Sequence, residues 1–115
     1  MNDLHDRDEL LEKLRLELRR GALPLAVLAQ LRTEHYTYSL RKEINALGLD
    51  IDEGTLYPLV RRLEKQGLLN SEWRSEDKRK KRYYQISALG QEVLAALVIE
   101  WHSLNNSLAS ILKEH

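Results

Sequence analysis

The sequence of 115 residues contains no cysteine and no phenylalanine. Without cysteine, the chain can form neither disulfides nor cysteine-ligated zinc sites, and thiol catalysis is excluded. Without phenylalanine, the core must be built from leucine, valine, isoleucine, tyrosine and tryptophan. A chain of this length suits one small domain with a core of modest size.

Long apolar runs and catalytic motifs are missing as well. The longest fully apolar run, residues 93–99, is far too short to span a bilayer, and the acidic N-terminus lacks a secretory apolar core. We therefore expect a soluble, cytoplasmic protein. No nucleophile–base motif, phosphate loop or carboxylate pair supports catalysis, so we expect neither an enzyme nor a cofactor. Four scattered histidines lack the spacing of metal ligands, so we predict no metal site: His5, His35, His102 and His115.

Basic residues are concentrated in the middle of the chain. The formal net charge of the whole chain is zero at pH 7, which argues against a protein that coats nucleic acid indiscriminately. Residues 55–82 hold nine lysines and arginines against four acids, a net charge of about +5. This distribution favours one nucleic-acid-binding face and leaves the other faces for different contacts.

Apolar periodicity predicts four helices in the first 70 residues, at about 8–20, 24–33, 38–47 and 55–69. Gly21 is expected to end the first helix, and Pro24 to lie in the first turn of the second. We interpret Thr37 as the N-cap of the third helix, whose buried stripe is expected to include Leu47. The third and fourth helices, joined by a short turn that contains glycine, are typical of a helix-turn-helix.

The helix at 55–69 has two different faces. Its apolar stripe consists of Leu56, Leu59, Val60 and Leu63. Asp52 can cap its start, and Gly67 can end it in the left-handed conformation. Tyr57, Arg61, Arg62 and Lys65 lie largely off the stripe. Such side chains reach phosphates and base edges of DNA, although in isolation a solvated helix face is the more common explanation.

A β-hairpin is predicted directly after this helix. Polar and apolar residues alternate at 69–74 and again at 83–86, around a charged loop at 75–81. A hairpin in this position is a wing. Its cations Lys78, Arg79, Lys80 and Lys81 are expected to contact phosphates, and Arg79 could enter a minor groove. The alternative is an ordinary polar hairpin loop.

The final helix is expected to run from an N-cap at Ser87 to about Lys113. Apolar residues recur in it at alternating spacings of three and four, the pattern of a coiled-coil seam: Leu94, Leu97, Trp101, Leu104, Leu108 and Ile111. We therefore predict a winged helix-turn-helix domain at 1–87 and a dimerisation helix at 88–115. The predicted fold class is mainly α with a small β-hairpin (α+β).

Three stretches resemble the PadR-like family of bacterial transcriptional regulators: YTYSLRKEI, GTLYPLVRRLEKQGLL and RYYQISALGQEVL. The resemblance covers roughly Ala22 to the C-terminus and is to the short-tailed branch, in which one C-terminal helix makes the dimer. It implies a homodimeric winged-helix repressor of inverted-repeat operators, which a small hydrophobic or phenolic compound releases from DNA. The family wing commonly carries glycine near its tip, and this chain has none there.

The resemblance also assigns roles to individual residues. The block from Thr55 to Lys65 matches the family's recognition helix, in which Tyr57, Arg61 and Arg62 would face DNA. Independently of the resemblance, Tyr36 and Tyr38 could donate to phosphates from the start of their helix, although core or strand packing is the more common role of such tyrosines. Trp101 lies where short-tailed members often carry an aromatic residue at the dimer seam. We interpret Trp101 mainly as a dimer core residue, with Leu97 and Trp101 as candidate walls of an effector site. The alternative function is a winged-helix protein-interaction module whose basic face docks an acidic partner.

Overall fold

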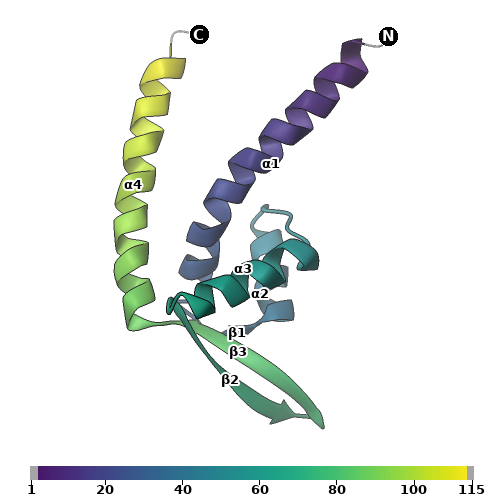
Figure 1. The fold of residues 1–115 in the computed structure, drawn as a ribbon, viewed down its shortest axis with the longest axis vertical. Coiled ribbons are helices and arrows are strands. Elements are labelled where there is room, and N and C mark those ends of the chain that lie inside the picture. Colours follow the sequence, from purple (N-terminus) through teal and green to yellow (C-terminus); the bar gives the residue numbers. More distant parts are fainter. Residues whose placement is uncertain (1–2, 114–115) are drawn as a thin grey trace.

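The computed structural model describes residues 3–113, which form four helices and one three-stranded antiparallel sheet (Figure 1). In chain order the elements are α1 Asp3–Gln30, β1 His35–Tyr36, α2 Thr37–Ala46, α3 Glu53–Lys65, β2 Leu69–Glu76, β3 Arg79–Ile86 and α4 Ala88–Leu112. The strand order in the sheet is β1-β3-β2. This mainly helical arrangement with a small sheet confirms the predicted fold class.

The first two predicted helices are in fact one helix, α1. It continues past Gly21, the predicted end, and holds Pro24 in its interior. In a helix interior, glycine costs roughly 1 kcal/mol and proline roughly 3 kcal/mol. The C-terminal half of α1 offsets these costs because it buries Leu23, Val27 and Leu28 in the core, each contributing about 1.5–3 kcal/mol.

A two-residue strand, β1, precedes α2 and was not predicted. His35 pairs with Tyr84 of β3, and Tyr36 pairs with Tyr83. Tyr36, rather than Thr37, is therefore the residue before the helix, and its side chain makes no capping hydrogen bond. The prediction of a Thr37 cap is wrong, because sheet pairing already holds the preceding residue in the extended conformation.

The far end of α2 also departs from the prediction. The helix ends at Ala46, and the chain then turns through Gly48 at a φ of +97°. Leu47 lies in this turn and is 71% exposed, so its predicted burial is wrong. The turn carries the chain to α3 and completes the helix-turn-helix.

The core lies between the C-terminal half of α1, the pair α2 and α3, and the sheet. Tyr84 is its largest fully buried side chain, which fits a chain without phenylalanine. The predicted stripe of α3 is buried in full: Leu56, Leu59, Val60 and Leu63. Leu94 of α4 is only 5% exposed and packs in this same core. Its assignment to the dimer seam is therefore corrected, because little of its surface remains for a partner.

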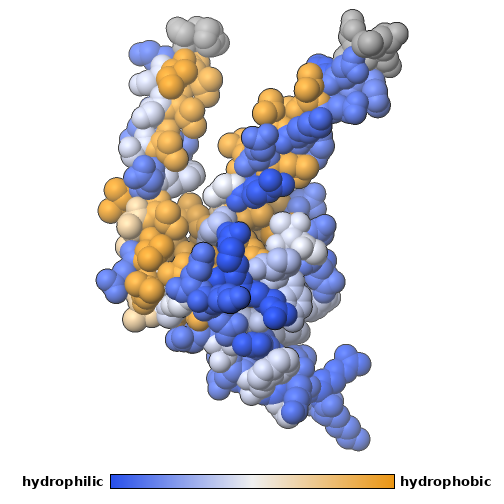
Figure 2. All heavy atoms as spheres, in the orientation of Figure 1, coloured by the Kyte–Doolittle hydropathy of each residue, from blue (hydrophilic) through white to orange (hydrophobic). Residues whose placement is uncertain are grey.

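Two helices leave the body of the molecule on the side opposite the hairpin (Figure 1). The N-terminal half of α1 and the C-terminal half of α4 diverge, and both carry apolar surface (Figure 2). The exposed apolar residues of α1 include Leu11, Leu14 and Leu18, and those of α4 include Leu104, Leu108 and Ile111. Within residues 3–113, no helix has the length and apolar character needed to cross a membrane.

The start of α4 is fixed tightly against the turn between α3 and β2. Ser87 caps α4, as predicted: its Oγ accepts from the Gly90 N–H at 2.9 Å and donates to the Gly67 carbonyl at 2.7 Å. A Cβ atom at Gly90 would lie only 2.2 Å from the Leu68 carbonyl oxygen. Glycine at this position is thus required by a close approach of two backbone segments.

Gly90→Ala should destabilise the protein by about 1–3 kcal/mol, because the added methyl group forces the Leu68 backbone and α4 apart. The matched control is Gly21→Ala, where no atom lies within 4 Å and where alanine should stabilise α1 by about 0.5–1 kcal/mol. Urea unfolding at one fixed protein concentration measures both variants. Equal stability of the two variants would contradict the close packing at Gly90.

Candidate nucleic-acid interface

Helix α3 presents the predicted polar face to solvent. Tyr57, Arg61, Arg62 and Lys65 are all exposed, on the side opposite the buried stripe. The Asp52 side chain caps the helix as predicted, by accepting from the Thr55 N–H at 2.9 Å. Hydrogen bonds from Thr55 hold the pKa of the Asp52 carboxyl below its ordinary value, because they favour the ionised form that accepts them.

The bounds of α3 differ from the predicted ones. It begins at Glu53 and ends at Lys65, whereas the prediction placed residues 55–69 in the helix. Gly67 follows at a φ of +83°, in the left-handed conformation expected of a helix-ending glycine. Leu69 is already part of β2, where it is buried. The helix is therefore short, and the hairpin begins immediately behind it.

The hairpin is longer and its turn is tighter than predicted. Asp77 and Lys78 form a two-residue turn, with φ values of +48° and +65°, the pattern of a type I′ turn. The predicted loop at 75–81 is wrong, since Ser75 and Glu76 belong to β2, and Arg79, Lys80 and Lys81 belong to β3. Cross-strand pairing of Glu76 with Arg79 favours this register. Aspartate tolerates a positive φ, which suits Asp77 to the first position of this turn, and Lys78 adopts a positive φ at the second position without glycine.

The four predicted wing cations do not have equivalent surroundings. Lys78, Arg79 and Lys80 are exposed at or next to the turn. Lys81 is half-buried: its Nζ lies 3.8 Å from Glu76 Oε1 and 4.3 Å from the centre of the Tyr36 ring. The structure therefore brings three of the four cations to the tip and engages the fourth within the protein.

Two further arginines of the basic segment have acidic partners. Arg74 donates to both carboxylate oxygens of Glu34, at 2.7 and 2.6 Å, and also bonds Glu72. Arg82 donates to Glu64 at 3.0 Å. Glu64 and Glu72 are already subtracted in the net charge of about +5 for residues 55–82. Glu34 lies outside that segment, so its pair with Arg74 is the one that lowers the positive charge further.

A second cationic surface lies at the start of α2, next to Tyr38. The Tyr38 ring is exposed and stacks near Tyr36, with ring centres 6.3 Å apart. The Arg41 guanidinium and the Lys42 ammonium lie 5.8 and 5.9 Å from its centre. Tyr38 was predicted as a site residue from the sequence, whereas Arg41 and Lys42 were not. Their spacing of three and four residues from Tyr38 was the available signal, because such residues share one helix face.

The opposite end of the molecule holds an apolar cavity of about 570 Å³ between α1 and α4. The two candidate effector residues, Leu97 and Trp101, both line it, and Trp101 is 44% exposed. Other lining residues are Leu18, Pro24, Leu25, Leu104 and Leu108. Among residues 3–113, no three histidines or carboxylates gather as a metal would require; His115 lies outside this range.

An exposed helix with arginine and tyrosine, preceded by a second helix and followed by a basic hairpin, defines a winged helix-turn-helix protein. Residues 25–96 match the PadR-like family of transcriptional regulators. The chain belongs to this family, and it is accordingly a transcriptional regulator with a DNA-binding fold.

Similar proteins agree with this assignment. A transcriptional regulator of Mycobacterium tuberculosis is 37% identical over 79 residues, which are 68% of this chain and 74% of that protein. The crystal structure of a PadR family transcriptional regulator from Eggerthella lenta is 40% identical, with a TM-score of 0.90 over 96% of this chain and 99% of that one. A PadR-like regulator from Bacillus cereus is 26% identical, with a TM-score of 0.75 over 84% of this chain and 96% of that one.

The Glu34–Arg74 pair yields a prediction about pH. Hydrogen bonding to Arg74 lowers the pKa of Glu34 from its ordinary value of 4.5. Because the pKa is lower in the folded state, this carboxylate stabilises the fold above pH 4.5, and its contribution disappears as the pH falls through the folded-state pKa. A carboxyl NMR titration should give a Glu34 midpoint below 4.5, which moves back toward 4.5 in Arg74→Gln. An unchanged midpoint in that variant would show that the pair does not persist in solution.

Proposed function

We propose that the protein is a homodimeric repressor that binds palindromic operators and is released by a small hydrophobic or aromatic compound. The observation that carries the proposal is the separation of two surfaces. A hydrophilic surface that includes the exposed cations of α3 and the wing lies at one end, and an unpartnered apolar surface of α1 and α4 lies at the other (Figure 2). We assign DNA binding to residues 1–87 and dimerisation mainly to 88–115.

The dimer proposal rests on the outer half of α4. Trp101, Leu104, Leu108 and Ile111 are all exposed, although their spacing of three and four residues places them on one face of the helix. A contiguous apolar stripe of this kind is unfavourable in water and marks an interaction site. A second copy of the helix offers the same stripe, as a two-fold interface requires. The exposed leucines of α1 extend this surface.

The DNA-binding proposal uses the polar surface around α3. In a two-fold dimer, two copies of α3 would enter successive major grooves about 34 Å apart on a palindromic site. Tyr57, Arg61 and Arg62 are the candidates for base contacts, with Thr55 and Lys65 beside them. Tyr38 and the wing cations would contact phosphates, which give affinity without sequence information.

The effector proposal rests on the cavity at Leu97 and Trp101. Its volume of about 570 Å³ suits a small molecule, and such sites are typically apolar with a few polar groups. A flat aromatic ligand would stack on the Trp101 indole. Because α4 continues from the wing through Ser87, a ligand that alters the packing of α4 would change the distance between the two copies of α3 in the dimer. The operator complex would then weaken, which relieves repression.

Selection of bound fragments from genomic DNA at physiological salt tests the proposed function. We expect an enriched inverted repeat with half-sites about one helical turn, roughly 10 base pairs, apart. An Arg61→Ala variant is the matched control and should lose about 1–3 kcal/mol of discrimination between operator and random DNA. Failure to recover any DNA, together with capture of an acidic protein, would overturn the proposal in favour of a protein-interaction module.

Leu104→Lys tests the dimer. A lysine at this exposed seam position places a charge in the proposed interface, so the chain should become monomeric. Operator affinity should then fall by more than about 100-fold, because a monomer engages one half-site only. The control is Ile99→Lys, which replaces another exposed apolar residue on the opposite side of α4 and should leave the dimer intact. Light scattering and fluorescence anisotropy measure the two effects, and a Leu104→Lys dimer would place the two-fold contact elsewhere.

A further inference from the structure

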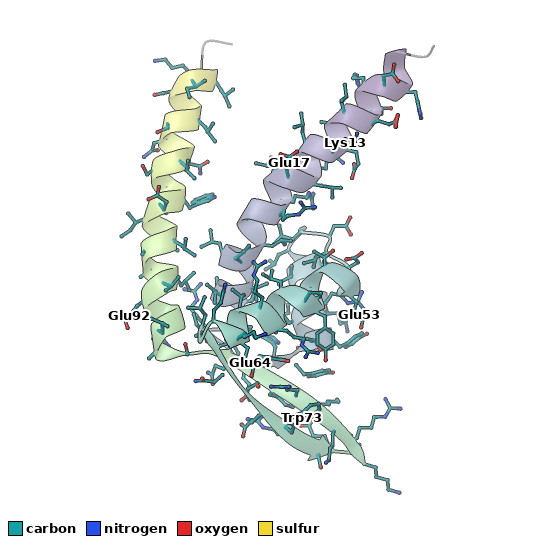
Figure 3. All side chains as sticks on the ribbon, viewed as in Figure 1. Lys13, Glu17, Glu53, Glu64, Trp73 and Glu92 are labelled. Carbon is teal, nitrogen blue, oxygen red and sulfur yellow. The ribbon has the colours of Figure 1, made fainter. Side chains whose placement is uncertain are left out.

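Trp73 is a large aromatic residue that neither the core nor the apolar seam uses. It lies partway along the hairpin (Figure 3) and is 60% exposed. Exposing so much indole surface to water is unfavourable, and tryptophan is usually well buried. The indole of Trp73 is therefore available for a contact outside the chain.

The strand register places Trp73 on the face of the hairpin that looks toward α3. Directly opposed residues share one face of an antiparallel pair, and here Leu69 opposes Ile86, Ser71 opposes Tyr84, Trp73 opposes Arg82, and Ser75 opposes Lys80. The inner members of this series, Leu69 and Tyr84, are buried in the core with the stripe of α3. Trp73 thus lies on the same face of the hairpin as Leu69 and Tyr84, but nearer to the hairpin tip.

A polar network holds the surroundings of Trp73 in place. Glu64 lies near the end of α3 (Figure 3). Its carboxylate accepts from Ser71 of β2 and from Arg82 of β3. Arg82 Nε also donates to Ser71 Oγ at 2.9 Å. The Arg82 guanidinium lies 5.5 Å from the centre of the Trp73 ring, within the range of a cation–π contact. The network therefore restricts the movement of Trp73 relative to α3, and less side-chain entropy is lost when a partner binds.

The sugar–phosphate backbone of DNA would suit the surface that Trp73 shares with α3 and the wing. When a helix occupies a major groove, the wing approaches the adjoining minor groove. The DNA backbone strand that separates these two grooves then passes between the helix and the wing. The phosphates of this DNA strand would meet the exposed cation Lys80 of β3, which lies on the same face of the hairpin as Trp73. Between phosphates, the same strand offers the apolar C–H surface of deoxyribose, which a tryptophan ring can cover.

We propose that Trp73 is a DNA-contact residue whose ring packs on the deoxyribose of this strand. The proposal rests on the proposed DNA-binding function and adds an apolar, sequence-independent contact to it. Such a contact strengthens binding to operator and random DNA alike, because deoxyribose is the same at every position. It also leaves the salt dependence of binding unchanged, since tryptophan neutralises no phosphate.

Fluorescence anisotropy with an operator duplex and a random duplex, each over a range of salt concentrations, tests the contact. Trp73→Ala should weaken binding to both duplexes by about tenfold, the effect of losing roughly 1.4 kcal/mol, with the same salt slope as the unmodified chain. Trp73→Phe retains an aromatic ring and should recover most of the affinity. Lys80→Ala is the contrasting control and should reduce the steepness of the salt slope by about 0.9.

The outcomes separate the contact from the function on which it rests. If the unmodified chain binds no DNA, the proposed function fails. If that chain binds DNA and Trp73→Ala binds equally well, the contact at Trp73 is overturned while the function stands. A weaker salt slope in Trp73→Ala would also overturn it, because the residue would then act by positioning the wing cations. Thermal unfolding of both Trp73 variants confirms that each is folded.

Discussion

The close approach of α4 to the turn behind α3 is the constraint on which the rest of the structure depends. Gly90 meets the Leu68 carbonyl, the Ser87 N–H donates to that same carbonyl at 3.0 Å, and Ser87 Oγ bonds Gly67. Next to it, the Ile86 N–H donates to Leu31 at the end of α1, at 2.8 Å. One junction thus joins both diverging helices to α3 and the wing. Because packed interiors transmit displacement, a change between α1 and α4 has a direct route to the proposed DNA-binding surface.

The cations of the basic segment, residues 55–82, include some that pair with acids of the protein and others that stay exposed. Arg74 and Arg82 pair with Glu34 and Glu64, and so attach the sheet to the segment before β1 and to α3. Lys78, Arg79 and Lys80 stay exposed at the tip. Paired arginines hold the wing in a fixed position, and the exposed cations are the ones available to phosphates. Charge counts along a sequence cannot separate these two roles, because the acidic partner of Arg74 lies 40 residues away.

Sequence patterns correctly predicted the elements that bury one face and that begin or end at a capping residue or a glycine. The stripe of α3, its Asp52 cap, the left-handed Gly67 and the Ser87 cap of α4 were all predicted and are all present. The errors fall where tertiary packing overrides local preference. Burial of Leu23 and Val27 carries α1 through Gly21 and Pro24, and strand pairing extends the hairpin into the predicted loop and creates β1 from two residues. Leu94, part of the predicted seam, lies instead in the core.

By itself, the sequence determined the class of protein, because helical periodicity, caps and the distribution of basic residues along the chain are local properties. It also determined which residues face away from the core on α3. The tertiary structure alone decided which cations are free, where Trp73 lies and which part of the α4 seam remains open to a partner. Each of these depends on contacts between residues far apart in the chain, such as Glu64 with Arg82 and Leu18 with Trp101 across the cavity. Periodicity carries no information about such contacts, since it reports only which residues share a face of one element.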